Sequence, residues 1–354
     1  MKQIRQDLHK IPELGFKEYK TKQYILDRLK GRCEIIEIGR TSFGVYFNFF
    51  KERTITLRAE LDALPIIEDN DITYKSTHEG CMHACGHDGH MAILISLIED
   101  ILDKKIDCTS NVLFLFQASE ETIGGSEEIL KSGILDEYKV SEIYGMHIWP
   151  NLPKGEIFTK SGSLLSKPTE FDIDIIGKST HVATYYQGKD ALHIGVELLH
   201  DIKKETRLID NTIVHIGEVY SHGQRNIVSD NFLCKGTIRT FDDKLLLRIC
   251  EIINRWINFY SDTYDVKINL MVNSSLSSLV NDESLVEESL RYGVKLIDYP
   301  YFHSEDFSLY LNKYKGVYFL LGAGNVPSLH NSRFNFDEGI LEKGKSLFVN
   351  LLMK

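Results

Sequence analysis

Two patterns of hydrophobic residues alternate along the first third of the chain, one typical of strands and one typical of helices. Residues 54–60 alternate apolar side chains with others, which predicts a strand. Residues 112–116 form a continuous apolar run, which is typical of a strand covered on both faces. Residues 91–102 repeat leucine and isoleucine at helical spacing, which predicts a buried helix between these two strands.

Weaker helix signals lie on either side of this pattern. Residues 4–30 have helical spacing that is interrupted at Pro12 and Gly15. Ser126 is the expected N-cap of a short helix that ends at Gly133. The alternation of helices and strands indicates an α/β fold with a mixed, largely parallel sheet flanked by helices.

The pattern changes near residue 165. A strand, a helix, two strands, a helix and a strand follow one another, which is the order of a ferredoxin-like α+β domain. These six segments are residues 169–176, 190–204, 212–219, 231–241, 243–260 and 264–272. The first pattern then returns with the apolar run 317–321. We therefore expect a main domain of residues 1–165 and 276–354, and an inserted domain of residues 166–275.

Composition narrows the class of protein. The 354 residues exceed one typical core, since a domain has about 100–200 residues. A net charge of −10 argues against a nucleic-acid partner, which needs a basic face. The longest plainly apolar run, residues 91–98, is far shorter than the roughly 20 residues that span a membrane. Six scattered cysteines and an N-terminus without an apolar stretch favour a cytoplasmic protein with no membrane partner.

The segment before the predicted buried helix is rich in metal-binding residue types. Three histidines and one cysteine lie within the nine residues from 82 to 90. Cys85 and His87 are separated by one glycine, so a thiolate and an imidazole can converge from one loop on Zn²⁺ or a related ion. His83 and His90 cannot both join them without crowding. Two other interpretations are a polar turn with capping histidines and a cysteine nucleophile with a histidine base.

Carboxylates and single histidines follow three further strands. Glu120 and Glu121 lie at the end of the apolar strand, where one can bind a metal and the other can act as general base; a solvated loop is the alternative. His147 and His330 each follow an apolar strand and, with the other residues, could complete two metal shells. Asp62 at another strand end is a candidate to orient a ligand histidine.

These motifs resemble those of the amidohydrolase branch of the M20 metallopeptidases, essentially from end to end. Within that branch the chain resembles in particular the N-acetyldiaminopimelate deacetylases. The segments that carry the family resemblance are residues 5–16, 58–65, 82–88, 116–121, 145–150, 304–307 and 329–330. The subfamily resemblance rests on residues 11–16, 113–117, 159–162 and 236–240.

The resemblance implies a site with two divalent metal ions, Zn²⁺ or else Mn²⁺, Co²⁺ or Ni²⁺, with Glu120 as general base and then acid. Asp62 matches the strand-end aspartate of the family. The inserted domain resembles a lid and dimerisation domain, so a homodimer is expected. The implied metal ligands are Cys85, His87, Glu121, His147 and His330, and the resemblance implies that Cys85 bridges the two ions. The implied substrate contacts are His181, which polarises the scissile carbonyl, Asn226 and Arg239; polar residues on the lid surface are the alternative.

The expected function is therefore metal-dependent removal of an acyl group from a small N-acyl amino acid. The expected substrate is N-acetyl-L,L-diaminopimelate, which would give L,L-diaminopimelate and acetate for lysine biosynthesis. A general aminoacylase or hippurate hydrolase and a catalytically silent metal-binding dimer are the alternatives. Glu60 stands where the family commonly has aspartate, and its extra methylene is expected to shift a contact beside the metal site.

Overall fold

A computed structural model describes residues 1–29, 31–122, 124–274 and 276–354. Lys30 and Ser275, which end the expected helical region 4–30 and the expected inserted domain, lie outside the described residues, as does Ile123. The chain divides into two compact units. The first comprises Met1–Leu164, Val280–Tyr299 and Glu305–Lys354, and the second comprises Leu165–Leu279 and Pro300–Ser304.

The first unit contains an eight-stranded mixed sheet with the order β1-β2-β4-β3-β5-β16-β6-β15. Its central strands β4, β3, β5 and β16 run parallel, whereas β1, β2 and β6 join antiparallel neighbours. The α/β fold with a largely parallel sheet is thus confirmed. The strands are β1 (Glu34–Glu37), β2 (Phe43–Phe47), β3 (Thr54–Glu60), β4 (Asn111–Gln117), β5 (Val140–Pro150), β6 (Ile157–Thr159), β15 (Lys295–Leu296) and β16 (Lys315–Gly324).

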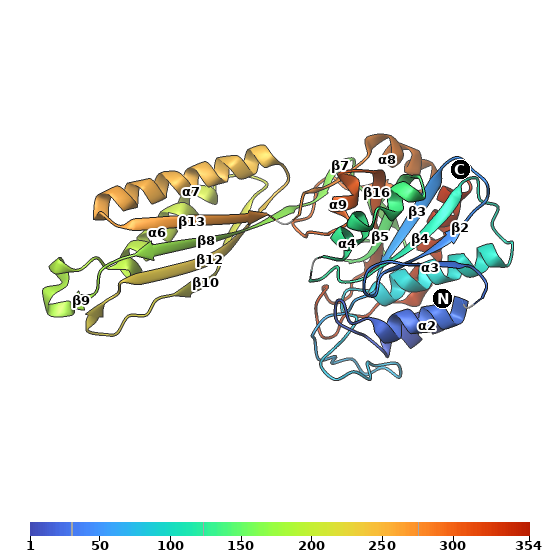
Figure 1. The fold of residues 1–354 in the computed structure, drawn as a ribbon, viewed down its shortest axis with the longest axis horizontal. Helices are drawn as coiled ribbons and strands as arrows, with labels where there is room; N and C mark the ends of the chain where they lie inside the picture. Colours follow the sequence, from blue (N-terminus) through green and yellow to red (C-terminus); the bar gives the residue numbers. More distant parts are fainter. Residues whose placement is uncertain (30, 123, 275) are drawn as a thin grey trace. The chain divides into compact units, whose positions relative to one another are not determined.

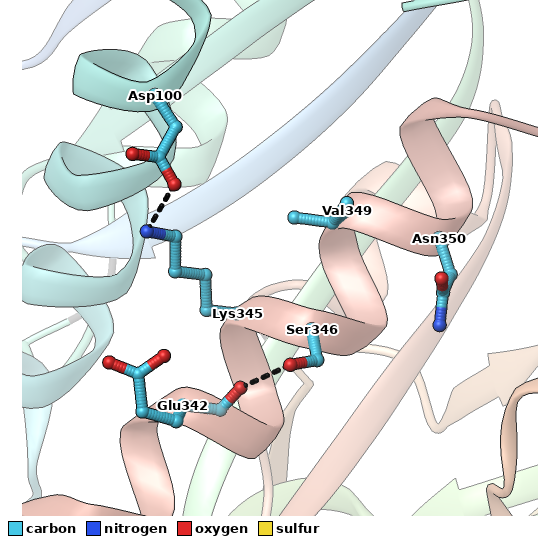
Figure 2. Close-up of a pocket in the computed structure, with 6 residues that line it drawn as sticks. All are labelled: Asp100, Glu342, Lys345, Ser346, Val349 and Asn350. Atoms are coloured by element: carbon cyan, nitrogen blue, oxygen red, sulfur yellow. Dashed lines mark hydrogen bonds and ion pairs between the residues drawn. The ribbon is translucent and has the colours of Figure 1, made fainter. Parts of the chain in front are cut away.

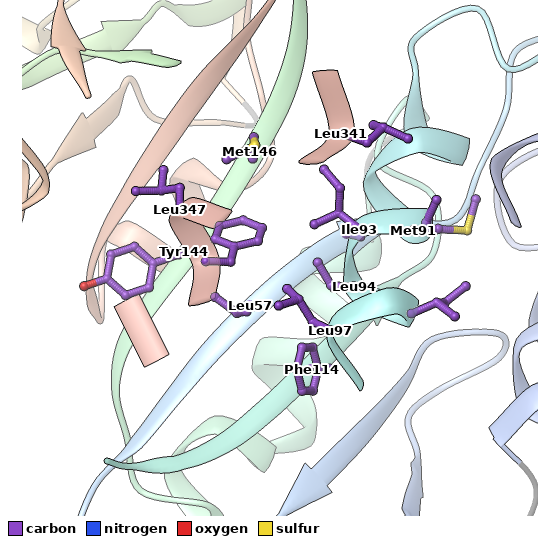
Figure 3. Close-up of a cluster of buried hydrophobic side chains, with 14 of the residues drawn as sticks. Leu57, Met91, Ile93, Leu94, Leu97, Phe114, Tyr144, Met146, Leu341 and Leu347 are labelled. Carbon is purple, nitrogen blue, oxygen red and sulfur yellow. The ribbon is translucent and has the colours of Figure 1, made fainter. Parts of the chain in front are cut away.

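Helices cover this sheet, and one of them is buried almost throughout. Met91, Leu94 and Leu97 of this helix, α3, pack beside Leu57 of β3 and Phe114 of β4 (Figure 3). Each such buried side chain stabilises the fold by about 1.5–3 kcal/mol. The helices of the first unit are α1 (Lys2–His9), α2 (Tyr19–Leu29), α3 (His87–Leu102), α4 (Gly125–Ser132), α5 (Ile134–Glu137), α8 (Glu283–Ser289), α9 (Ser308–Leu311) and α10 (Leu341–Leu352), with short 3₁₀ turns at Leu290–Tyr292 and Glu338–Ile340.

Two helix starts differ from the sequence predictions. Helix α3 begins at His87 instead of residue 91, because Gly86 takes a left-handed conformation with φ 88° that starts the helix one turn earlier. The prediction that Ser126 is the N-cap of α4 is wrong. The N-cap is Gly124, and Ser126 lies in the first turn, where its backbone N–H donates to Asp306 Oδ2 (3.3 Å). Gly133 ends α4 as expected, with φ 74°.

The second unit has the predicted ferredoxin-like order of elements. Its four strands form an antiparallel sheet in the order β10-β12-β8-β13. Phe171, Ile173 and Ile175 of β8 are buried with apolar residues of α6 and α7, so both helices cover the same sheet face (Figure 1). The elements are β8 (Lys167–Ile176), α6 (Ala191–Thr206), β10 (Ile213–Tyr220), β12 (Asn231–Thr240), α7 (Asp243–Tyr264) and β13 (Lys267–Ser274).

Smaller elements complete the chain. Strands β9 (Thr180–His181) and β11 (Ile227–Val228) pair with each other, and the 3₁₀ helix η1 (Val182–Gln187) follows β9. Strands β7 (Gly162–Leu165) and β14 (Leu279–Asn281) form a further two-stranded sheet. Among the described residues, no helix has both the length and the apolar character needed to cross a membrane.

Candidate metal centre

The five predicted ligands come together in the first unit, where several strands of the sheet end. Cys85 precedes α3, His87 begins it, Glu121 follows β4, His147 lies in β5 and His330 follows β16. Cys85 Sγ lies 3.3 Å from His147 Nε2 and 3.4 Å from His330 Nε2. His330 Nε2 lies 3.2 Å from Glu121 Oε1. Residues from four separate parts of the chain therefore place sulfur, nitrogen and oxygen donors within reach of one another.

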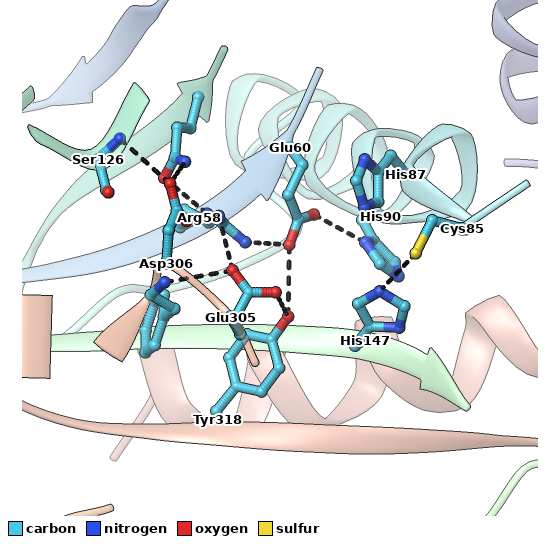
Figure 4. Close-up of polar contacts among 12 residues, drawn as sticks. Arg58, Glu60, Cys85, His87, His90, Ser126, His147, Glu305, Asp306 and Tyr318 are labelled. Carbon is cyan, nitrogen blue, oxygen red and sulfur yellow. Dashed lines mark hydrogen bonds and ion pairs between the residues drawn. The ribbon is translucent and has the colours of Figure 1, made fainter. Parts of the chain in front are cut away.

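The donors form two groups that share the cysteine. Cys85, His87 and His147 form one group and Cys85, Glu121 and His330 form the other, and in each the donor atoms lie within 4.8 Å of one another. Figure 4 shows the first group, with Cys85 and His147 facing each other. Two adjacent ions with Cys85 between them would fit this arrangement.

Hydrogen bonds select the nitrogen that each buried histidine offers. His87 Nδ1 lies 2.9 Å from the Asp62 carbonyl oxygen, and His147 Nδ1 lies 2.8 Å from the Ile148 carbonyl oxygen. Since a carbonyl can only accept, both rings carry their proton on Nδ1 and leave a lone pair on Nε2. His87 Nε2 is buried without a hydrogen-bond partner among the described residues. A buried, unpartnered nitrogen is costly, and a thiolate, imidazole and carboxylate donor set fits Zn²⁺ or a related ion.

The loop of His330 is held in an unusual conformation next to Cys85. His330 has φ 63°, a left-handed conformation that residues other than glycine rarely adopt. Its backbone N–H donates to the carbonyl oxygen of Ala84 at 2.9 Å. This bond joins the loop after β16 to the residue before Cys85. The strained backbone conformation thus lies at the residue whose side chain contacts the shared cysteine.

Asp62 supports the centre by a route that differs from the expected one. The close contact to His87 comes from the Asp62 backbone carbonyl, while its carboxylate Oδ1 lies 3.5 Å from His87 Nδ1. The other carboxylate oxygen, Oδ2, accepts the backbone N–H of Glu121 at 3.0 Å. Asp62 therefore contacts two candidate ligands at once, one through its backbone and one through its side chain.

Glu120 lies between the candidate ligands and a second group of carboxylates. Its carboxylate is within 4.8 Å of His87 and Glu121 donor atoms on one side, and of Glu305 and Asp306 oxygens on the other. Burial, followed by the charges of Glu305 and Glu121, raises the pKa of Glu120 well above its usual range. A carboxylate with a raised pKa beside a metal site suits a group that takes up and returns a proton.

The environment of Cys85 disfavours the cysteine-nucleophile alternative. Burial, and then the charges of Glu121 and Glu120, raise the pKa of the Cys85 thiol well above its usual range. A nucleophilic cysteine needs a lowered pKa and a histidine that can take its proton. A nearby cation would instead stabilise the thiolate, as metal ligation requires.

A charged network behind the centre was not foreseen from the sequence. Arg58 is fully buried in β3, donates from Nη2 to Glu305 (2.9 Å) and Asp306 (2.6 Å), and also contacts Glu60 (Figure 4). His90 Nδ1 lies 2.7 Å from Glu60, and the Ile148 N–H donates to His90 Nε2 at 2.9 Å. Both nitrogens of His90 are thus used, which removes it as a ligand candidate.

A second network fixes the start of α3. Asp88 Oδ2 accepts from Arg5 Nε (2.9 Å) and lies 2.7 Å from His9 Nδ1, so helix α1 is joined to the residue next to His87. Burial alone would raise the pKa of Asp88, but Arg5 and His9 lower it well below its usual range. His83 is buried nearby, and neither ring nitrogen has a partner among the described residues. His83 belongs to none of the candidate donor groups found there.

Replacing Arg58 by methionine is expected to destabilise the protein by about 3–5 kcal/mol, because it leaves buried carboxylates without their cation. The free energy of unfolding from urea denaturation measures this loss. Arg333→Met is the matched control. Arg333 pairs with Asp69 at the surface, with 67% and 60% of the two side chains exposed, so its loss should cost less than about 1 kcal/mol. Equal losses for both variants would contradict this account of the buried network.

The predicted substrate residues lie in the second unit. His181 ends β9 opposite Ile227, and the N–H of Val182 donates to the Asn226 carbonyl oxygen at 2.9 Å, so His181 and Asn226 are neighbours. Arg239 is not beside them. It pairs with Pro168 near the start of β8, whereas β9 follows the end of β8. The roles of all three residues remain predictions.

A surface hollow between α3 and α10 offers no comparable chemistry (Figure 2). Lys345 Nζ lies 2.5 Å from Asp100, and the Ser346 hydroxyl donates to the backbone carbonyl oxygen of Glu342 at 2.7 Å. None of the candidate metal donors lines it.

Comparison with known proteins identifies the family. A family model described as peptidase family M20/M25/M40 matches residues 56–354. The chain belongs to this family. Its members hydrolyse amide bonds, so the protein is an amide hydrolase, and the donor groups described above support a metal-dependent one.

Individual relatives cover nearly the whole chain. N-acetyldiaminopimelate deacetylase of Oceanobacillus iheyensis is 32% identical, with 99% of this chain and 98% of that protein covered. The enzyme of the same name from Bacillus subtilis is 34% identical, with 96% and 94% covered. The crystal structure of the YXEP protein of Bacillus subtilis, described as a dinuclear metal binding peptidase from the M20 family, has a TM-score of 0.88 at 28% identity. It covers 99% of this chain and 95% of that one.

Proposed function

We propose that this protein uses two divalent metal ions to remove the acetyl group of N-acetyl-L,L-diaminopimelate. The observation that carries the proposal is the pair of donor groups that share Cys85, with the carboxylate of Glu120 within 4.8 Å of His87 and Glu121. A binding protein would have no use for a second carboxylate beside the ligand carboxylate. The named deacetylases at 32% and 34% identity support the choice of substrate.

The residues of the chain have distinct parts in the proposed reaction. Cys85, His87, Glu121, His147 and His330 would hold the ions. When bound, such ions polarise an amide carbonyl and lower the pKa of water. Glu120 takes a proton from the attacking water and returns it to the departing nitrogen, for which its raised pKa is suited.

Other residues orient these groups. Asp62 and Ile148 fix the rings of His87 and His147 through backbone carbonyls, so neither ring has to reorganise during the reaction. We extend the proposal to His181, Asn226 and Arg239 as contacts for a small N-acyl amino acid. A cytoplasmic homodimer that forms through the second unit also belongs to the proposal.

Acetate release from three substrates tests this function. With Zn²⁺, Mn²⁺ or Co²⁺ added, we expect a higher kcat/KM for N-acetyl-L,L-diaminopimelate than for N-acetylmethionine, and benzoate release from hippurate should be slowest. A preference for either of the other two compounds would agree with the assignment as an amide hydrolase but would reject the proposed substrate. No turnover of any of them would favour the silent metal-binding dimer.

A further inference from the structure

The network around Arg58 holds more buried carboxylates than cations. We call Arg58, Glu60, Glu305 and Asp306 the Arg58 cluster; all four side chains are buried (Figure 4). Arg58 supplies one positive charge. His90 adds none, because the Ile148 N–H donates to its Nε2, which must therefore carry a lone pair. Three ionised carboxylates would thus face a single guanidinium in the interior, an arrangement that favours retention of a proton by one of them.

The hydrogen bonds of the other two carboxylates disfavour that proton. Asp306 accepts from Arg58 at Oδ1, and from Gln117 Nε2 (2.7 Å) and the Ser126 N–H (3.3 Å) at Oδ2. Glu60 Oε2 faces the Nδ1–H of His90 at 2.7 Å. These partners are all donors, so they stabilise the ionised form of Asp306 and Glu60 at the oxygens that they contact.

Glu305 has the closest contact to a partner that can reverse its role, the hydroxyl of Tyr318. Its Oε1 accepts from Arg58 and from the Phe307 N–H (3.2 Å), but its Oε2 lies 2.6 Å from the hydroxyl of Tyr318. A hydroxyl can accept as well as donate. The same hydroxyl lies 3.4 Å from Glu60 Oε1, so it can accept a hydrogen bond from a protonated Glu305 while it donates one to Glu60.

The position of Glu305 connects this proton with the proposed base. Oxygen atoms of Glu120, Glu305 and Asp306 lie within 4.8 Å of one another. If Glu305 were ionised, a second anion would face Glu120 at this distance in a buried site. Repulsion would then move Glu120 away from its working position or make it hold its proton more tightly.

We propose that Glu305 is a positioning residue for amide hydrolysis, which retains a proton at neutral pH and so places an uncharged carboxyl group beside Glu120. This inference rests on the proposed function and on Glu120 as its base. It gives a purpose to a segment, residues 304–307, for which the proposed reaction has no other use. Glu305 itself is not expected to touch the substrate.

The electrostatic environment agrees with this assignment. Burial raises the pKa of Glu305, Arg58 lowers it, and Glu60 and Asp306 raise it again, to about 8 in all. The active form is the protonated one, so kcat should fall as the pH rises through this value. The titratable and charged groups that face Glu305 are Arg58 and Glu60 of β3, His90 of α3, Glu120 after β4, Asp306 beside it, Tyr310 of α9 and Tyr318 of β16.

The pH dependence of Glu305→Gln and Glu305→Ala tests the proposal. Glutamine keeps an oxygen for Arg58 and an N–H₂ group for Tyr318, so it mimics the protonated acid. For the wild type we expect kcat to fall by about tenfold for each pH unit above 8, with KM little changed. Glu305→Ala should lose about 10–100-fold in kcat at neutral pH, and Glu305→Gln should recover most of this loss and lack the alkaline decrease.

Glu142→Gln is the matched control. Glu142 is also buried, accepts from a tyrosine hydroxyl (Tyr144, 2.7 Å) and faces an arginine (Arg53, 3.4 Å), but it belongs to none of the donor groups near Glu120. It should keep the alkaline decrease of the wild type. An unchanged alkaline decrease in Glu305→Gln, or equal losses in the alanine and glutamine variants, would overturn the proposal.

Infrared spectroscopy reads the proton without turnover. The infrared difference spectrum of wild type minus Glu305→Gln should contain the C=O band of a protonated carboxyl group at neutral pH. This band should vanish above pH 8. The difference between wild type and Glu142→Gln should lack it. Absence of the band at neutral pH would overturn the proposal even in an active enzyme. A band in a protein that hydrolyses no acyl amino acid would reject the proposed function and leave the protonated Glu305 standing.

Discussion

Glu120→Gln is expected to lower kcat for acyl-amide hydrolysis by about 10²–10⁴-fold while the protein still binds its metal ions. The variant keeps the size and one acceptor oxygen of the side chain but cannot take up a proton. Because the candidate ligands are other residues, the donor groups that share Cys85 stay intact. Acetate release together with the metal content of the purified variant measures both parts of this expectation.

Glu127→Gln is the control for this substitution. Glu127 lies on α4, only seven residues further along the chain, and its side chain is 43% exposed and pairs with Lys131. It should retain wild-type kcat. Full activity in Glu120→Gln would show that another residue is the base. Loss of metal from this variant would show that Glu120 is a metal ligand.

Cys85→Ala should have the second large effect, because it removes the donor that both groups share. Residues that only orient metal ligands contribute about 10–100-fold to metal affinity, so the loss of a shared ligand should exceed about 100-fold and should affect both ions. His147→Ala and His330→Ala each remove a donor from one group and should mainly weaken one ion. Metal content after dialysis against a weak chelator compares the three variants.

Cys108→Ala provides the matched control, since Cys108 is also buried but belongs to no donor group among the described residues. It should bind metal like the wild type. If Cys85→Ala kept both ions and lost only activity, the cysteine would be a nucleophile. In that case alkylation would inactivate the enzyme and chelators would not.

The sequence predicts helices and strands best where apolar residues recur at regular spacing. The strand over residues 54–60 matches β3, because alternation along the sequence is typical of strands. The alternation did not reveal that both faces of β3 are buried, polar side chains included. The start of α3 was placed four residues late, because its first turn carries polar residues such as His87 and Asp88, whose burial depends on a metal site and on Arg5. The cap of α4 was wrong because Ser126 uses its backbone N–H for Asp306, a contact distant in sequence.

The candidate site was predictable only in part for the same reason. Cys85 and His87 stand out locally, but Cys85 and His330 are 245 positions apart, and single histidines after strands do not reveal their partners. Family resemblance supplied the full donor set. The Arg58 cluster was missed because Arg58 and Glu305 are 247 positions apart and a charged residue in a strand usually faces solvent. The one local signal was a strand whose alternate positions, Arg58 and Glu60, are both charged.

Metal titration of the stripped protein tests the central claim most directly. Metal-free protein would be titrated with Zn²⁺, Mn²⁺ or Co²⁺ while acetate release from N-acetyl-L,L-diaminopimelate and the number of bound ions per chain are measured together. We predict negligible release before metal is added and a rise in activity that levels off at about two ions per chain, the number that two donor groups sharing Cys85 would hold. Full activity in the stripped protein with a chelator present would contradict the account.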